Sequence, residues 1–150
     1  MTYRAEEISE ASQARVSSEG GKYGRKPDYR VKIVAGSGKE LEFVFIESSR
    51  PVADVDKYIE DWLKLCRLCK DAHTSMSLFF KKEMLENSDD CKELLNKLYS
   101  LPIFALQIKG KVFHIATLDM AYGIFYRMLG LESFEIPLEL RRVWNLSSNN

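Results

Sequence analysis

Cysteine and histidine are scarce in this sequence, and it has no long apolar run. Its 150 residues include three cysteines, none in a disulfide-type spacing, so we expect reduced thiols in the cytoplasm or nucleus. No apolar stretch approaches the roughly 18 residues that a membrane span requires. The start, MTYRAEEISE, lacks the apolar core of a secretory signal. We therefore expect an intracellular, soluble protein without a transmembrane segment.

Neither sign of charge is in excess. The 22 Lys and Arg residues balance 22 Asp and Glu residues, so the formal net charge is zero. Proteins dedicated to nucleic acids or membrane surfaces usually carry a basic excess, and the balance argues against both classes. The sequence is 45% hydrophobic and 11% aromatic, which at this length predicts one domain with a substantial core.

The segment 48–70 predicts the central helix of the fold. Its apolar residues recur at three- and four-residue steps, the pattern of one helical face; they are Val52, Val55, Ile59, Trp62, Cys66 and Cys69. We expect Trp62 to lie in the core. We expect this helix to end near 71–73, a second helix to begin at Thr74 or Ser75, and Ser88 to cap a third.

Alternating apolar residues on either side of this helical block predict two β-hairpins. The first joins 29–33 to 41–46 through Gly36-Ser37-Gly38-Lys39, and the second joins 103–108 to 112–118. The first turn resembles a phosphate-binding loop. However, the position five residues before the Gly-Lys pair is not a glycine and a strand follows instead of a helix, so we interpret it as a hairpin turn.

The C-terminal part has helical signals. Asp119 is expected to cap a short apolar helix over 120–129, and Pro137 to begin another. The order ββ-ααα-ββ-αα predicts a single α+β domain with about four mainly antiparallel strands, in two hairpins, packed against helices. We expect this domain over residues 28–146, after a flexible N-terminal arm (1–27) and before a frayed tail (147–150).

A C-x-x-C pair is the one metal-type spacing. Cys66 and Cys69 form this pair, His73 lies one turn further on, and Cys91 is a candidate fourth zinc ligand. Structural zinc pairs usually lie on turns, whereas these cysteines lie inside an amphipathic helix, where cysteine commonly serves as a small apolar residue. We therefore expect neither a metal nor a cofactor.

Catalytic signals are few. With only His73 and His114 in the chain, histidine-based catalysis has few possible arrangements. We consider the protein more an interaction protein than an enzyme. A deep pocket around His114 with a second titratable group beside it would favour the enzyme alternative.

Short basic clusters offer a second alternative. Arg25, Lys26, Arg30 and Lys32 are interleaved with two tyrosines, a pattern that suits single-stranded nucleic acid. A solvated charged face is the competing interpretation of the same residues.

The segment 43–62, FVFIESSRPVADVDKYIEDW, resembles one segment of rhabdovirus matrix proteins, in which an aromatic-rich strand enters a Ser-x-Arg-Pro turn and then a helix carrying a tryptophan. The resemblance implies a non-enzymatic viral protein that self-associates, condenses a nucleocapsid and contacts membrane. The chain departs from that family in having no PPxY-type motif near its start and no strongly basic arm.

Our first hypothesis is a self-assembling or protein-binding domain, matrix-like or an accessory protein. The stretch 120–129 contains more apolar residues than one helical face can bury, which is typical of a central or interface element. The predicted partner-facing residues are Tyr122, Phe125, Tyr126 and Trp144. Nucleic-acid binding through the basic arm and first hairpin is the second hypothesis, and a small enzyme is the third.

Overall fold

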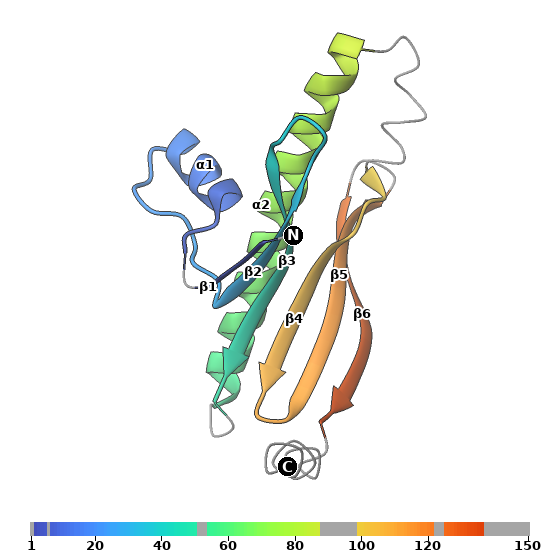
Figure 1. Cartoon of the computed structure of the whole chain (residues 1–150). Helices are drawn as coiled ribbons and strands as arrows, with labels where there is room; N and C mark the ends of the chain where they lie inside the picture. Colours follow the sequence, from blue (N-terminus) through green and yellow to red (C-terminus); the bar gives the residue numbers. More distant parts are fainter. Residues whose placement is uncertain (1, 6, 51–53, 88–98, 122–124, 137–150) are drawn as a thin grey trace, which may run out of the picture.

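The computed structural model describes residues 2–5, 7–50, 54–87, 99–121 and 125–136. One sheet contains six strands in chain order: β1 (Thr2–Ala5), β2 (Tyr29–Val34), β3 (Glu40–Ser49), β4 (Ile103–Lys109), β5 (Val112–Ala121) and β6 (Phe125–Glu135). Two helices accompany it, α1 (Glu10–Ser18) and α2 (Val55–Asn87) (Figure 1). The α+β class is confirmed, whereas the number and order of the strands differ from the prediction.

Both predicted hairpins are present. Strands β2 and β3 pair antiparallel, as do β4 and β5, and their turns contain Gly38 (φ 83°) and Gly110 (φ 61°). These left-handed conformations are the ones that favour glycine. The two hairpins join through β3 and β4, which run parallel. A parallel pair needs a long crossover connection, and α2 lies in that connection.

Helix α2 is longer than predicted. The break expected at 71–75 does not occur, and one helix of 33 residues runs from Val55 to Asn87. The expected cap, Thr74, instead hydrogen-bonds the Tyr126 hydroxyl through its own Oγ1 at 2.6 Å. The stretch contains neither glycine nor proline, and the buried Ala72 and Met76 continue the apolar face across it.

The predicted helix over 120–129 is wrong. Strand β5 continues to Ala121, and Phe125–Glu135 returns as β6, paired antiparallel with β5. Asp119 is therefore not a helix cap. It accepts two hydrogen bonds from Arg127 across the hairpin, at 2.9 and 2.7 Å. The predicted helices at 88–98 and from Pro137, and the tail 147–150, lie outside the described residues.

The predicted N-terminal arm forms two elements. Strand β1 pairs with β2, and α1 lies against α2 (Figure 1). Ser9 caps α1 by accepting from the Ser12 amide at 3.2 Å, and Glu42 of β3 accepts from the amides of Glu10 and Ala11. The first turn of α1 is thus held by a carboxylate of the sheet.

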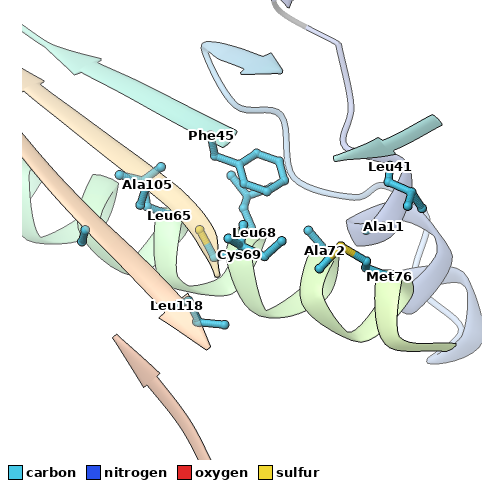
Figure 2. Close-up of a cluster of buried hydrophobic side chains, with 12 residues drawn as sticks. Ala11, Leu41, Phe45, Leu65, Leu68, Cys69, Ala72, Met76, Ala105 and Leu118 are labelled. Atoms are coloured by element: carbon cyan, nitrogen blue, oxygen red, sulfur yellow. The ribbon is translucent and has the colours of Figure 1, made fainter. Parts of the chain in front are cut away.

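The core lies between α2 and the sheet. Leu65, Leu68 and Cys69 of α2 meet Phe45 of β3 and Ala105 of β4, while Ala11 of α1 joins near one end of the cluster (Figure 2). Trp62 is partly buried and packs against this cluster, in line with its predicted core position. Among the described residues, no helix is long and apolar enough to cross a membrane.

Candidate functional site

Strand β6 forms one edge of the sheet. It pairs with β5 on one side, and no other described strand pairs with its second side. Its side chains are largely exposed, including four large apolar ones: Phe125 (69%), Leu129 (40%), Leu131 (56%) and Phe134 (44%). A long edge strand presents unpaired backbone N–H and C=O groups, which are a template for pairing with another chain.

The face of the sheet opposite α2 is apolar as well. In β4, Ile103, Ala105 and Gln107 are buried towards α2, while the alternate residues are only half-buried. The strand pairings place further apolar residues on this outer face; together they are Val44, Ile46, Phe104, Leu106, Ile108, Phe113 and Ile115. Among the described elements, neither helix covers it. Such a contiguous apolar face is typical of an interaction surface.

The outer face continues onto β6. Phe134 stacks on Phe113, with ring centroids 5.2 Å apart and planes at 10°. The β5–β6 register also sets Arg127 opposite Asp119 and Glu132 opposite Ile115. Leu131 forms a β-bulge: it is unpaired between Gly130 and Glu132, so the alternation of side chains shifts by one residue there. As a result, Phe125 and Arg127 lie on the same face as Glu132 and Phe134. On this face, β6 therefore carries two aromatic residues and one charge of each sign, with Leu129 between the charges.

The structure separates the predicted partner-facing residues. Phe125 is the most exposed apolar residue of β6. Tyr126 points the other way, against α2: its ring lies edge-on to His73 at 5.6 Å, and Lys70 lies 5.6 Å from its centroid. It is thus a packing residue rather than a partner-facing one. Tyr122 and Trp144 lie outside the described residues.

Sequence reasoning missed Leu129, Leu131 and Phe134 as interface candidates. The incorrect helix assignment ended the apolar element at residue 129, so 131–136 was left without a structure. The signal that identifies Leu131 and Phe134 is the recurrence of apolar residues in LESFEI (131–136), where short polar residues separate them.

Two of the four predicted nucleic-acid-binding residues are buried. Arg30 is 2% exposed and pairs with Glu42 and Glu7, while Lys32 is 1% exposed and pairs with Glu10 and Glu40. Their charges are neutralised inside the fold. Arg25 and Lys26 remain accessible, and the predicted four-residue basic surface is not assembled.

The candidate zinc residues are not brought together. Cys69 is fully buried in the core, and its thiol lies 3.8 Å from the Phe104 carbonyl oxygen, whereas Cys66 is only half-buried. Burial raises the pKa of both thiols, which opposes thiolate formation. Among the described residues, no group of metal-ligating side chains could hold an ion; Cys91 lies outside them.

A cavity of about 460 Å³ lies between α2 and strands β5 and β6, with His114 and Glu132 in its wall. The His114 Nδ1 and Ser133 Oγ are 2.6 Å apart. A serine nucleophile with a histidine base also needs a third group to orient the imidazole. Within the described part of the chain, His114 Nε2 has no hydrogen-bond partner, so the contact lacks that orienting group.

Comparison of the chain with protein-family models, with curated proteins and with solved structures finds no match in any of the three. The resemblance of 43–62 to rhabdovirus matrix proteins therefore stays a prediction.

Proposed function

We propose that this protein is a self-associating interaction module in which β6 of one copy pairs antiparallel with β6 of a second copy. The observation that carries the proposal is the exposed apolar edge strand of 11 residues. Edge strands support intermolecular pairing because their outward backbone groups find partners in another strand. A two-fold contact suits this edge, since an antiparallel pair of identical strands is self-complementary.

The side chains of β6 favour one register. In antiparallel pairing, a step of two residues up one strand matches a step of two down the other. The register that sets Arg127 opposite Glu132 of the second copy therefore also sets Phe125 opposite Phe134. Each pair occurs twice across the two-fold axis. Opposite charges and aromatic residues then face each other, and each cross-strand pair contributes about 0.2–1 kcal/mol.

The apolar outer face supports the same arrangement. Pairing at β6 joins the outer faces of two sheets into one broader apolar surface, on which the Phe113–Phe134 stack lies next to the junction. Burial of Phe125 removes the largest exposed apolar side chain of the edge from water, and apolar burial is worth about 25 cal/mol per Å².

Light scattering on a sizing column, at two protein concentrations, tests the proposal. We expect a species of twice the 17.3 kDa monomer mass that dissociates on dilution. Phe125→Lys should weaken association at least about tenfold, because at each end of the paired strands it replaces an aromatic contact with a charge. Leu78→Lys is the matched control, since the exposure of Leu78, 64%, is close to the 69% of Phe125, but Leu78 lies on α2.

A charge substitution tests the register. Glu132→Lys places a like charge opposite Arg127 of the second copy, once on each side of the two-fold axis, and should weaken association several-fold. Glu135→Lys makes the same change three residues along the same strand, outside the Arg127 pairing, and should have a smaller effect. A single 17.3 kDa species at both concentrations would overturn the proposal. Equal effects of the two lysine variants would overturn only the register.

A further inference from the structure

The cavity between α2 and strands β5 and β6 has aromatic walls. Tyr58 and Trp62 lie one helical turn apart on α2 and line one side of it, while His114 of β5 lines another. The His114 ring stands edge-on to the Tyr58 ring, with the two centroids 5.9 Å apart. The volume of about 460 Å³ is typical of small-molecule sites, which span about 300–1,000 Å³. We call this site the aromatic cavity.

Gly130 of β6 lines the aromatic cavity and leaves room in it. It pairs with the buried Ala116, so a side chain at this position would point towards α2. Its backbone lies outside the left-handed region, so neither the chain conformation nor the bulge at Leu131 requires a glycine here. Beyond its chain neighbours, a Cβ would meet no atom of a described residue within 4 Å. A glycine inside a strand often marks the close approach of a ligand, and the space for one is present here.

His114 supplies a polar group to the aromatic cavity. Its Nδ1 lies 2.6 Å from Ser133 Oγ, which leaves Nε2 for another partner. Within the described part of the chain, Nε2 has no hydrogen-bond partner, and it is not one of the unpartnered side-chain atoms that are buried from solvent. A ligand in the cavity can therefore reach it. Nε2 donates or accepts according to the tautomer, and a hydroxyl group suits both cases because it can do either.

Two charged residues of opposite sign lie at the border of the aromatic cavity. Glu132 lines it from the exposed edge strand, and its pairing with Ile115 places its side chain on the outer face. Lys109 lies on the Tyr58 ring, 5.2 Å from its centroid. One charge of each sign favours neither an anion nor a cation, and a charged ligand would lose water without gaining a dedicated counter-ion. An uncharged ring gains instead from packing against Tyr58 and Trp62.

We propose that the aromatic cavity binds a small uncharged phenol, with its ring against Tyr58 and Trp62 and its hydroxyl group hydrogen-bonded to His114 Nε2. A phenol meets both requirements at once, because an aromatic hydrocarbon has no hydroxyl group and an aliphatic alcohol has no ring. The site lies on the side of β6 that faces α2, whereas the proposed pairing of two copies uses the outer edge of that strand. Ligand binding and self-association can therefore be tested separately.

Titration of the full chain with 2-naphthol, naphthalene and 2-naphthoate, which share the same two rings, tests this site when followed by amide NMR. Saturable binding of 2-naphthol is expected, with shifts of the Gly130 and Ser133 amides and of the Trp62 indole. Naphthalene should bind about fivefold more weakly, because it lacks the hydrogen bond to His114. A purely apolar cavity would show the opposite order, since naphthalene has no hydroxyl group to remove from water. The charged 2-naphthoate should bind at least about tenfold more weakly than 2-naphthol.

Three variants locate the ligand. Gly130→Val fills the space that the glycine leaves and should weaken 2-naphthol binding at least about tenfold. Gly36→Val is the matched control, because a Cβ there likewise meets no described atom within 4 Å but Gly36 does not line the cavity. It should leave binding within about twofold. His114→Phe keeps a ring at its position and removes Nε2, so 2-naphthol should then bind no better than naphthalene.

Each other outcome overturns a stated part of the proposal. The absence of saturable 2-naphthol binding, or binding that Gly130→Val leaves unchanged, would remove the site. Equal binding of 2-naphthol and naphthalene, or a preference that survives His114→Phe, would remove the hydrogen bond to Nε2. Tighter binding of 2-naphthoate would replace the phenol with an anionic ligand. Light scattering of His114→Phe should match the native chain, and a monomeric chain that binds 2-naphthol would contradict the pairing of β6 alone.

Discussion

Replacement of Glu42 by glutamine should lower the stability of the protein strongly, because this carboxylate joins β2, β3 and α1. Its side chain is 4% exposed and accepts from Arg30 Nη1 at 2.5 Å and from Ser9 Oγ at 2.7 Å. It also accepts from the amides of Glu10 and Ala11, at 3.1 and 3.2 Å. Glutamine has a similar shape but carries no charge and has one acceptor oxygen instead of two.

The size of the stability loss follows from the buried Arg30, which loses one of its two acidic partners. Arg30 is 2% exposed, and its remaining acidic partner, Glu7, is 48% exposed. Removal of one partner of a buried ion pair costs about 3–5 kcal/mol. Because Arg30 keeps Glu7, we expect the lower end, about 3 kcal/mol. At this chain length about 1 kcal/mol corresponds to roughly 2–4 °C, so Tm should fall by about 6–12 °C.

Thermal and urea unfolding, at one fixed protein concentration, measure this change. The control is Glu135→Gln, since Glu135 is 63% exposed and lies 3.6 Å from Lys111. An exposed pair of this kind contributes at most about 1 kcal/mol. Hydrogen exchange should also speed up in α1. A Tm within about 2 °C of the native value would contradict the conclusion that Glu42 anchors α1 to the sheet.

Two further predictions concern buried titratable groups. A thiol reagent should modify Cys66 well before Cys69 in the native chain, because Cys69 is fully buried and burial raises the pKa of both thiols. Peptide mapping by mass spectrometry measures the two modification rates. Equal rates would contradict the prediction. Burial lowers the pKa of His73, so the unfolded chain takes up this proton at higher pH than the folded chain does. Stability should therefore fall as pH drops from about 7.5 to 5.5, and His73→Gln should flatten the urea midpoints across that range.

Local sequence signals predicted the two hairpins and residues 55–70 of α2 correctly, whereas Ser48 and Ser49, at the start of the predicted helix, belong to β3. Alternation in 29–33 and 41–46 predicts strands because one face of each is buried, and Gly38 and Gly110 mark their turns. The parallel joining of β3 and β4 was not predicted. The order of strands in a sheet depends on contacts between segments far apart in the chain. The periodicity of apolar residues and the residues of the turns give no information about these contacts.

The error over 120–129 has a physical cause. A short, almost continuous apolar run has neither the period of a helix nor that of a strand, so its pattern fits both. The adjacent Asp119 looks like a helix cap by sequence, yet it pairs with Arg127 eight residues later. The segment forms a strand because it pairs with β5. This pairing is a tertiary contact, which the local sequence does not reveal.

The same limitation applies to the charged residues. Arg30 and Lys32 look like surface cations because they alternate with apolar residues in β2. The carboxylates that neutralise them come from β3, from α1 and from Glu7 just before α1. Both α1 and Glu7 belong to the segment that the sequence predicts as a flexible arm. Buried ion pairs of this kind are recognised only when their distant partners are known.

The two edges of the sheet differ in length, and under the proposed pairing of β6 this difference fixes the size of the assembly. At one edge β1 has four residues, whereas β6 at the other has 11. Short edge strands are a common protection against intermolecular pairing, so growth through β1 is disfavoured. A two-fold contact between β6 strands uses the long edge of both copies and leaves only short edges outside. Such a contact closes on itself, whereas a contact between unlike surfaces would propagate into a filament. We therefore expect a dimer that does not grow with concentration.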